Sequence, residues 1–319
     1  MAVYTEVTDG MLNAFLAQYD LGEAVAFRGI AEGVENSNYA LRTTQGDFIL
    51  TLYEKRVDPA DLPWFLGLLE HLAQHGLPCA LPVRARNGAN LNRLAGKAAA
   101  ITTFLPGVWP RDPTIAHCAE LGSALAQLHH AGVDYRTERP NALGPAAWPP
   151  LWAQCRDHAD AVEPGLQATL DRAITRIVPA WPATLPRGQI HADLFPDNVF
   201  FLDGKISGLI DFYFAATDFF ALDIAICLNA WCFEPDFSFN RAKSAALLQG
   251  YQAIRPLTQA EQSAVPLLCQ GAALRFLLTR LYDWLNTPAG ALVTKKDPRD
   301  YLRRLTTFHQ MTEGADYGL

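Results

Sequence analysis

The chain contains the sequence Ile190-His191-Ala192-Asp193-Leu194-Phe195-Pro196-Asp197-Asn198, and an apolar run at residues 199–202 follows it directly. This run turns at Asp203-Gly204-Lys205 into a second apolar run, residues 206–210, which ends at Asp211. An Asp-Gly pair between two apolar runs is the strongest short-range signal for a β-hairpin. We therefore predict a polar loop that leads into a hairpin, with Asp211 at the end of the second strand and close to Asn198 at the start of the first.

The polar residues around this hairpin suit phosphoryl transfer, which needs a carboxylate to orient the hydroxyl nucleophile and hard oxygen ligands for Mg²⁺. Asp193 offers the carboxylate, and Asn198 and Asp211 offer the oxygen ligands. A single loop Asp is more often a turn or cap residue, but three such residues around one hairpin favour catalysis. We expect His191 to brace the loop and Asp197 to serve the turn. A metallohydrolase is the alternative, although zinc sites usually contain more His or Cys.

The loop and the hairpin resemble a known family. Residues 191–198, together with Ile210-Asp211-Phe212, are similar to the catalytic and metal motifs of the aminoglycoside phosphotransferase and choline kinase group, which shares the protein-kinase-like fold. Within that group, residues 33–39, 48–55 and 273–283 closely resemble the bacterial homoserine kinases. The resemblance spans nearly the whole chain. It implies a bilobal α+β fold, with a five-stranded antiparallel N-terminal lobe and a mainly helical C-terminal lobe, and ATP and Mg²⁺ as cofactors.

Length and composition narrow the class of protein. At 319 residues, with 50% hydrophobic and 18% charged residues, the chain has room for sizeable cores and no sign of long disorder. A net charge of -7 without any Lys/Arg run argues against nucleic acid or an anionic membrane as partner and favours a small-molecule substrate. The six cysteines are scattered, so we expect reduced, mostly buried thiols and a cytosolic protein. We expect it to be soluble, because no signal-like segment and no apolar run of membrane length is evident.

Residues 1–104 are predicted to form the N-terminal, nucleotide-binding lobe. Apolar spacing indicates a short helix at residues 8–19 and another at residues 62–75. A turn is expected at Asn87-Gly88. Five antiparallel strands are expected, at residues 25–30, 39–43, 48–53, 81–83 and 98–104.

The loop between the first two strands, residues 31–38, is a candidate phosphate-binding loop. It contains Gly33 and small polar side chains, so its backbone N–H groups can approach phosphate oxygens. An ordinary polar hairpin loop is the alternative. We assign Asn36, Ser37 and Asn38 to nucleotide binding.

The third strand departs from the pattern that the resemblance implies. Protein-kinase-like folds normally carry a lysine there, which binds the phosphates and pairs with a helix glutamate. The matching position holds Thr51, which leaves Lys55, Arg42 or Arg28 as possible substitutes. We assign Lys55 to ATP binding and Glu70 as the partner of the cation. The alternative for Glu70 is a solvated helix residue.

The hinge is predicted at residues 104–107, and residues 105–319 are predicted to form the C-terminal lobe with the catalytic loop and the substrate site. The resemblance implies that backbone groups around Thr103 and Leu105 contact adenine, and that ATP lies in the cleft between the lobes. Apolar spacing predicts helices at residues 114–130, 152–160, 165–178, 224–231, 239–252, 258–268 and 270–284, and a short helix near the C-terminus.

Four polar residues of this lobe are given structural roles. We expect Asp218 and Asp223 to cap helices, as the equivalent acids of the family do. We expect His129 and His130, at the end of a helix, to complement the helix dipole rather than to bind metal.

Arg275, Arg280 and Asp283 interrupt an otherwise apolar helix, and charges so placed either pair or bind a ligand. We assign Arg275 to a substrate carboxylate, which a guanidinium can grip bidentately. The resemblance implies ATP-dependent phosphorylation of the side-chain hydroxyl of L-homoserine to O-phospho-L-homoserine, a step of threonine biosynthesis. Two alternatives stay open: a kinase of another small alcohol, such as choline, an aminoglycoside or a methylated sugar, and a non-catalytic nucleotide-binding regulator. The complete catalytic and metal set argues against the regulator.

Overall fold

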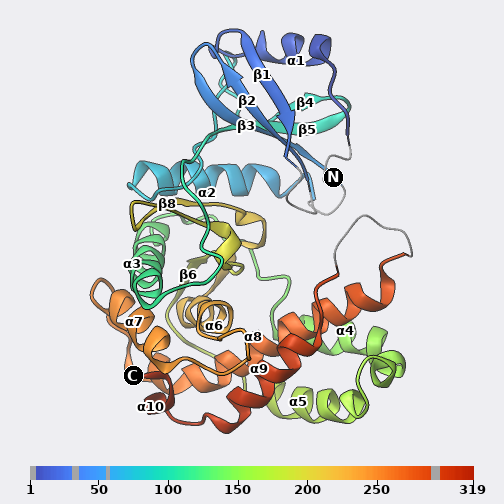
Figure 1. Cartoon of the computed structure of the whole chain (residues 1–319), viewed down its shortest axis with the longest axis vertical. Coiled ribbons are helices and arrows are strands. Elements are labelled where there is room, and N and C mark those ends of the chain that lie inside the picture. The colour runs from blue at the N-terminus through green and yellow to red at the C-terminus, as the bar shows by residue number, and fades with distance from the viewer. Residues whose placement is uncertain (1–4, 31–35, 55–57, 289–294) are drawn as a thin grey trace. The chain divides into compact units, whose positions relative to one another are not determined.

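The structure, a computed structural model, describes residues 5–30, 36–54, 58–288 and 295–319. The chain divides into two compact units (Figure 1). The first contains Met1–Gly107 and Ser207–Tyr213, and the second contains Val108–Ile206 and Phe214–Leu319. The segment that ends the predicted hairpin and carries Asp211 is therefore part of the first unit. The predicted α+β class is confirmed, with a five-stranded antiparallel sheet in the first unit and helices dominating the second.

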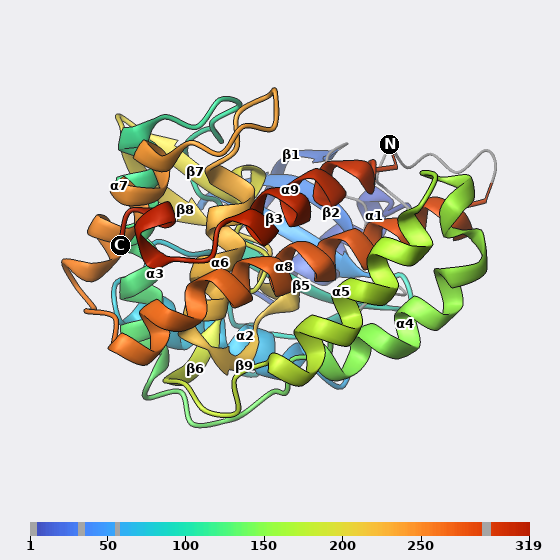
Figure 2. The same ribbon diagram turned by 90° about the horizontal axis from the view of Figure 1, so that it is seen from below.

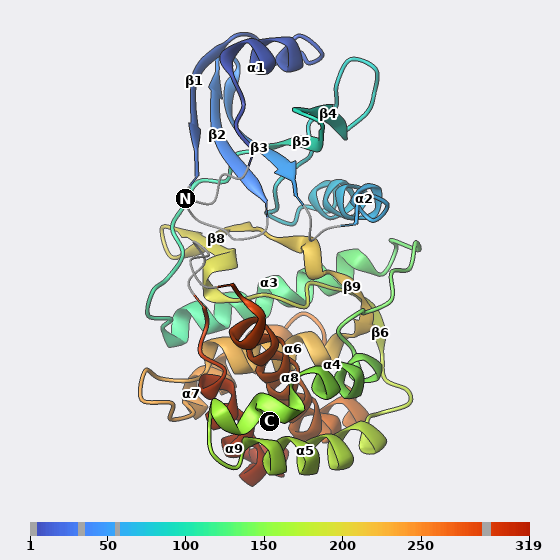
Figure 3. The same cartoon turned by 90° about the vertical axis from the view of Figure 1, so that its right-hand side faces the viewer.

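The sheet of the first unit has the order β1-β2-β3-β5-β4, and each neighbouring pair is antiparallel. Its strands are Ala24–Gly29 (β1), Ser37–Thr43 (β2), Gly46–Tyr53 (β3), Asn92–Leu94 (β4) and Lys97–Thr103 (β5). Helix α1, Asp9–Leu16, covers one face (Figure 3). There Leu12 and Phe15 pack with Leu50 and Ile101 in one buried cluster. The second helix of this unit is α2, Leu62–Gln74.

The fourth strand differs from the prediction. Residues 81–83 form only an isolated bridge, between Pro82 and Thr102. The N–H of Val83 donates to Ile101 and that of Thr103 to Leu81 on either side of it, so the missing N–H of Pro82 is tolerated there, but the pairing does not extend into a strand. The strand that completes the sheet is β4, which joins β5 through Ala95 and Gly96, with φ angles of 49° and 77°. Two left-handed residues in sequence are the mark of a type I′ hairpin turn. The Asn87-Gly88 turn forms, but it closes a loop ahead of β4.

The predicted hairpin after the catalytic loop is confirmed. Strands β7, Val199–Leu202, and β8, Lys205–Leu209, form a two-stranded sheet. Asp203 and Gly204 link them with φ angles of 51° and 77°. This is again the conformation that an Asp-Gly pair favours between antiparallel strands.

Helices make up most of the second unit. They are Ile115–Gly132 (α3), Trp148–Cys155 (α4), Leu166–Ala180 (α5), Phe220–Trp231 (α6), Arg241–Gln252 (α7), Gln259–Asn286 (α8), Arg299–Gln310 (α9) and Gly314–Tyr317 (α10). Short 3₁₀ turns lie at Pro145–Ala147, Arg156–Ala161 and Pro196–Asn198, and another, Phe212–Phe214, lies where the chain passes from the first unit to the second. Figure 2 shows α8 running alongside α9 and α5, and α8 also packs on α6 and α4. Two helices predicted on either side of residue 269 are one helix, α8, because Cys269 is fully buried and continues its apolar surface.

Helices α3 and α7 cross at very close range. A Cβ added to Gly122 of α3 would collide with the carbonyl oxygen of Leu247, and one added to Gly250 of α7 would collide with that of Ala119. Glycine at both positions lets the two backbones meet.

Helix α8 also bears on the membrane prediction. It is long and apolar enough to cross a bilayer, contrary to the prediction that no apolar run reaches that length, and 78% of its most apolar window is buried inside the structure. The core helix of a globular protein meets the same test. All six cysteines are buried and free, as predicted.

Candidate active site

The predicted catalytic loop follows strand β6, Arg187–Ile190, which pairs with β9, Ala216–Phe219. Asp193 is half-buried, and its N–H donates to Nδ1 of the fully buried His191 (3.3 Å). Nδ2 of Asn198 donates to the carbonyl oxygen of Asp193 (2.8 Å). His191 therefore braces the loop, as predicted, and Asn198 ties its two ends together.

Asp223 holds the backbone of this loop. Its carboxylate is fully buried and accepts the N–H groups of His191 (2.7 Å) and Ala192 (2.8 Å). The predicted capping role is wrong, because α6 has no side-chain cap and the Asp223 carboxylate turns to the loop instead of its own helix. It is also wrong for Asp218, which lies in β9 and accepts a hydrogen bond from Asn141 Nδ2 (2.8 Å). Hydrogen bonds to a charged group contribute about 1.5–3 kcal/mol each, so Asp223 fixes the residues just before Asp193 firmly.

His129 supports Asp223 from α3. It is fully buried, with Nε2 at 3.2 Å from Asp223 Oδ2 and Nδ1 at 2.7 Å from the Tyr251 hydroxyl. Burial lowers the pKa of His129 by more than the nearby carboxylate raises it. Burial alone would raise the pKa of Asp223, but the hydrogen bond and charge of His129 and the contributions of His191 outweigh it and lower that pKa. His129 therefore stabilises the ionised carboxylate of Asp223 from α3, a more specific role than the predicted complement to a helix dipole.

Ala192, just before Asp193, has a left-handed backbone with φ of 62°. That conformation costs a non-glycine residue about 1–2 kcal/mol. Both its polar groups are engaged, because its N–H donates to Asp223 and its carbonyl oxygen accepts a bond from Arg275 Nη1 (2.5 Å). The loop is therefore clamped in a strained conformation from α6 and α8.

Arg275, assigned to the substrate from the sequence, is only 4% exposed. Burial lowers the pKa of its guanidinium, and the carboxylate of Asp193 is the strongest influence in the opposite direction. Its Nε is buried and has no hydrogen-bond partner within the described part of the chain. The guanidinium is thus bound to the loop at Ala192, next to Asp193 in the sequence, and its Nε is left unsatisfied.

Asp211, in the first unit, also has a left-handed backbone, with φ of 64°. The residues after it are fixed by aromatic contacts. The ring of Tyr213 meets those of Tyr53 and Phe65 edge-on, with centroids 5.6 Å and 5.9 Å apart. These contacts attach the chain after Asp211 to the end of β3 and to α2.

The three polar residues assigned to nucleotide binding make hydrogen bonds inside the first unit. Asn36 Oδ1 accepts the N–H of Glu54 (3.2 Å), and Ser37 Oγ donates to Glu54 Oε1 (2.8 Å). Asn38 Oδ1 accepts the hydroxyl of Thr51 (2.8 Å). Their side chains therefore join the start of β2 to β3. The rest of the predicted phosphate loop, residues 31–35, lies outside the described residues.

Glu70 has a different partner from those considered in the sequence analysis. Its carboxylate lies 2.6 Å from Arg84 Nη2 and accepts a hydrogen bond from Asn90 Nδ2 (3.2 Å). Arg42 pairs with the aspartate across its own hairpin. Lys55 lies outside the described residues.

The residues at the predicted hinge pack within the first unit. The N–H of Thr103 donates to the carbonyl oxygen of Leu81, and the Thr103 hydroxyl accepts the N–H of Leu81 (both 3.0 Å). A Cβ added to Gly208 of β8 would lie 2.9 Å from Leu105 Cδ1, so Leu105 rests directly on that strand.

Sequence reasoning missed Asp223 and His129 as residues that position the loop. A usable signal was present for Asp223, since it is an acid inside the otherwise apolar helix sequence FALDIAICLNAW. An ionised side chain in such a helix must have partners elsewhere, because burying it alone costs far too much.

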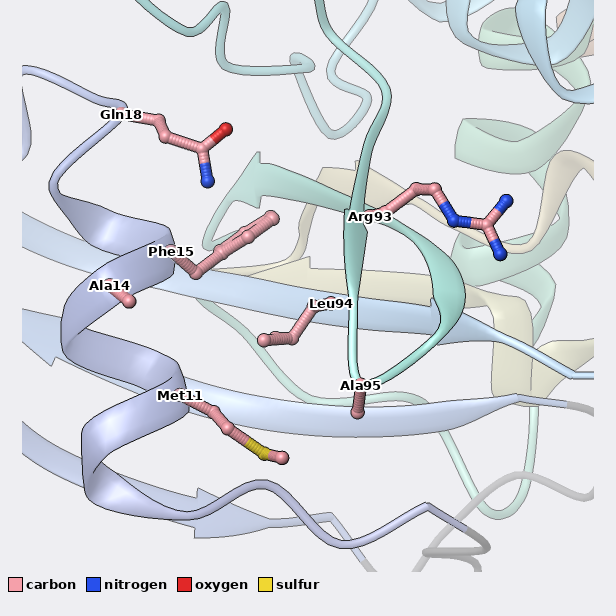
Figure 4. Close-up of a pocket in the computed structure, with 7 residues that line it drawn as sticks. All are labelled: Met11, Ala14, Phe15, Gln18, Arg93, Leu94 and Ala95. Carbon is pink, nitrogen blue, oxygen red and sulfur yellow. The ribbon is translucent and has the colours of Figure 1, made fainter.

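Two further features bear on the chemistry. Among the described residues, no group of three or more His, Cys, Asp or Glu side chains gathers as a zinc site would require. A hollow of about 220 Å³ between α1 and the β4–β5 turn, lined by Met11, Phe15, Arg93 and Leu94 among others, contains no acidic group (Figure 4). The catalytic loop is therefore the candidate active site.

Comparison with known proteins extends this picture. The family model described as the phosphotransferase enzyme family matches residues 26–257. Homoserine kinase of Acidiphilium cryptum (strain JF-5) is 71% identical over 319 residues, and the match covers 100% of both chains. Homoserine kinase of Granulibacter bethesdensis is 66% identical over 319 residues, again covering 100% of both.

Solved structures share the fold at low sequence identity. Amicoumacin kinase hAmiN, in complex with AMP-PNP, Ca²⁺ and Ami, matches with a TM-score of 0.70 and 17% identity, covering 96% of this chain and 94% of that one. Choline kinase from Cryptosporidium parvum Iowa II matches with a TM-score of 0.66 and 14% identity, covering 95% of each chain. At these identities the likeness shows the fold, and the fold predicted from the sequence is confirmed.

Proposed function

The chain belongs to the phosphotransferase enzyme family, and from this premise we propose that it transfers the γ-phosphoryl group of ATP to the side-chain hydroxyl of L-homoserine. The products are O-phospho-L-homoserine and ADP, and the reaction is a step of threonine biosynthesis. The proposal is supported by full-length identities of 71% and 66% to proteins named homoserine kinase. Identity of that extent over the full length of both chains favours the same reaction in this protein.

The observation that carries the mechanism is the clamping of the loop around Asp193. Ala192 is held by Asp223 and Arg275, and the carbonyl oxygen of Asp193 by Asn198. In the proposed reaction, the Asp193 carboxylate orients the homoserine hydroxyl and accepts its proton late. By then the new oxygen–phosphorus bond is forming and the bond to the ADP oxygen is breaking. Precise orientation matters because a misplacement of about 1 Å can cost about 100-fold in rate.

We assign Mg²⁺ binding to Asn198 and Asp211. The donor set fits, since both residues offer the oxygen ligands that Mg²⁺ prefers, and Zn²⁺ would call for His or Cys. Nδ2 of Asn198 is committed to Asp193, so Oδ1 is the atom that this side chain offers to a cation. When bound, Mg²⁺ neutralises negative charge on the phosphate oxygens.

For ATP, we assign the carbonyl group of Thr103 and the N–H of Leu105 to adenine, since the N–H of Thr103 is engaged by Leu81. Backbone N–H groups around Asn36, Ser37 and Asn38 are assigned to the phosphates, with their side chains holding that segment on β3. Lys55 is the proposed phosphate-binding cation. Glu70 is engaged by Arg84, so this proposal gives Lys55 no glutamate partner.

Arg275 is the proposed ligand of the homoserine carboxylate. One nitrogen of its guanidinium is bound to Ala192, and its unsatisfied Nε is left for an anion. A buried cation without its anion penalises substrates that lack one. We therefore expect hydroxy amino acids to outcompete choline and ethanolamine.

Substitution of Asp193 tests the mechanism, with Asp197 as a matched control in the same loop. Asp193→Asn is expected to lower kcat by about 100-fold or more, the usual contribution of a positioned general base. Asp197 is exposed, and Asp197→Asn is expected to leave kcat within about twofold, as surface substitutions usually do. ATP consumption should be measured with homoserine, choline, ethanolamine and an aminoglycoside. Normal turnover by a folded Asp193→Asn enzyme would remove Asp193 from its role, and a preference for choline or the aminoglycoside would overturn the substrate.

We also propose that the enzyme acts in the cytosol, with ATP and a small molecule as its partners. Six buried, free thiols suit a reducing compartment.

A further inference from the structure

Helices α8 and α9 run side by side (Figure 2), and a group of basic and aromatic side chains lies on them. At its centre is Tyr301 of α9, which is fully buried. The guanidinium groups of Arg280 and Arg304 lie 4.5 Å and 4.6 Å from the centroid of the Tyr301 ring. The ring of Phe276 lies 5.1 Å from that of Tyr301, and the Arg275 guanidinium lies 4.5 Å from Phe276. We call Arg275, Arg280, Tyr301 and Arg304 the α8–α9 basic group.

Three polar atoms of this group have no partner. Tyr301 Oη, Arg304 Nε and Arg275 Nε are buried and make no hydrogen bond to any residue that the structure describes. An unsatisfied buried donor costs about 1–3 kcal/mol, and more when it is charged. Native proteins leave few such atoms, so three in one place require an explanation. A ligand with acceptor oxygens provides one.

The charges point to the same kind of ligand. Arg280 pairs with Asp300 (3.3 Å), but across the described ranges neither Arg275 nor Arg304 forms an ion pair. Burial lowers the pKa of Arg280, and the positive charge of Arg304 lowers it further. Burial raises the pKa of Tyr301, against the opposing influence of Arg304 and Arg280. The group therefore has more positive than negative charge in a buried setting, which favours an anion.

The catalytic loop relates this group to the reaction. Arg275 Nη1 donates to the carbonyl oxygen of Ala192, the residue directly before Asp193. An anion bound at the free Nε edge of Arg275 would therefore lie close to the loop that carries the residue proposed to orient the hydroxyl. This arrangement suits a small substrate with a hydroxyl at one end and a carboxylate at the other.

We infer that Tyr301 and Arg304 of α9 join Arg275 in binding the carboxylate of the substrate, with Tyr301 Oη and Arg304 Nε as hydrogen-bond donors. Arg280, already paired with Asp300, holds the Tyr301 ring in place from the other helix. This inference rests on the proposed function, because it takes the substrate to be a hydroxy amino acid. It makes α9 a determinant of substrate choice.

The test compares homoserine with 3-aminopropan-1-ol, the same molecule without its carboxylate, and with 4-hydroxybutyrate, which lacks the ammonium group. Wild-type enzyme is compared with Tyr301→Phe, Arg304→Met and the control Arg303→Met. Arg303 neighbours Arg304 on the same helix but is exposed and lies over Phe237. Since Tyr301 Oη has no partner in the protein, Tyr301→Phe should fold at least as stably as wild type.

We expect Tyr301→Phe and Arg304→Met each to raise the KM for homoserine and for 4-hydroxybutyrate by about 10-fold or more, the effect of losing one hydrogen bond to a charged group. The kcat/KM for 3-aminopropan-1-ol and the KM for ATP should stay within about twofold, as should all values for Arg303→Met. Losses of equal size for homoserine and 3-aminopropan-1-ol would mean that the α8–α9 basic group is only structural and would overturn the inference.

The wild-type data separate this failure from failure of the proposed function. If wild-type enzyme phosphorylates homoserine well and discriminates against 3-aminopropan-1-ol, but Tyr301→Phe and Arg304→Met retain that discrimination, only the inference falls. If wild-type enzyme prefers 3-aminopropan-1-ol or choline, both fall.

Discussion

Asp223→Asn tests how the catalytic loop is held. In the wild-type protein, Oδ2 of Asp223 accepts the N–H of His191 and lies 3.2 Å from His129 Nε2, while Oδ1 accepts the N–H of Ala192 (2.8 Å). The asparagine side chain has one acceptor oxygen and one amide NH₂ group, which only donates. The oxygen is better placed at the Oδ2 position, where it meets both His191 and His129. The amide NH₂ group then faces the N–H of Ala192.

The expected loss of stability in Asp223→Asn follows from two opposing contributions at Ala192, a hydrogen bond and backbone strain. A hydrogen bond to a charged acceptor contributes about 1.5–3 kcal/mol, and two facing donors also leave one of them unsatisfied. The left-handed backbone of Ala192, with φ of 62°, costs about 1–2 kcal/mol and is kept only while its partners hold it. The hydrogen bond from Ala192 to Asp223 contributes at least as much free energy as the left-handed backbone costs. Without that bond, Ala192 should relax to an ordinary backbone conformation and displace Asp193. We expect about 2–4 kcal/mol loss in the free energy of unfolding and a fall in kcat of about 10- to 100-fold.

Urea unfolding followed by tryptophan fluorescence and steady-state ADP release measure the two effects. Hydrogen exchange at the amides of His191 and Ala192 reports the loop directly, and both should exchange faster in the variant. Asp171→Asn is the control, since Asp171 pairs with Arg156 at the surface (2.7 Å), where ion pairs contribute little. Asp171 also accepts the indole N–H of Trp152 (2.9 Å), which an amide oxygen can still accept, so a much smaller loss of stability is expected. Wild-type kcat and unchanged protection at Ala192 in Asp223→Asn would refute the account of the clamp.

Other expectations concern the metal, the pH dependence and the packing. Asp211→Ala should abolish Mg²⁺-dependent turnover while circular dichroism shows an intact fold; an unchanged Mg²⁺ titration of activity would contradict the assignment. The pKa of His129 is lowered in the folded protein, so the unfolded chain binds the extra proton first. Stability should therefore fall by up to about 1.4 kcal/mol per unit as pH drops below about 6.5, until the folded pKa is reached. His129→Gln should reduce that slope in urea titrations at pH 5 to 7, and an identical slope would exclude His129 as its source. Gly122→Ala should destabilise the protein despite a gain of about 1 kcal/mol in helix propensity, because the new Cβ would collide with Leu247; a raised Tm would show that α3 and α7 can separate freely.

The parts of the fold that could be predicted are those fixed by local chemistry. The Asp203-Gly204 pair specifies its hairpin turn almost alone, and alternating burial along β2 reflects the alternation in its sequence. The errors fall where local signals are weak or misleading. Pro82 interrupts a segment with strand-like neighbours, and β4 is only three residues long, too short to show a period.

The candidate site was only partly predictable, for a different reason. Asp193, Asn198 and Asp211 stand in a recognisable order along the chain, whereas the residues that hold the loop come from distant segments. Asp223 lies 32 positions from His191 and Arg275 lies 83 positions from Ala192, and sequence spacing says nothing about such contacts. The sequence indicated that the charges in α8 either pair or bind a ligand, but only the folded chain shows that Arg275 bonds to Ala192.

Thr51 of β3, at the position where the family resemblance implies a lysine, changes which partners the neighbouring polar residues have. A buried lysine at position 51 would require an acid to offset its charge, but the hydroxyl of Thr51 requires only an acceptor, and Asn38 supplies it (2.8 Å). Glu70 is therefore not needed to offset a charge on β3, and it pairs with Arg84, whose side chain is 58% exposed. An ion pair so exposed contributes at most about 1 kcal/mol to stability. It involves α2 and Arg84 and places no charge on strand β3. Strand β3 itself therefore offers no positive charge to phosphates, and we propose Lys55, two residues after the strand in the sequence, for that role.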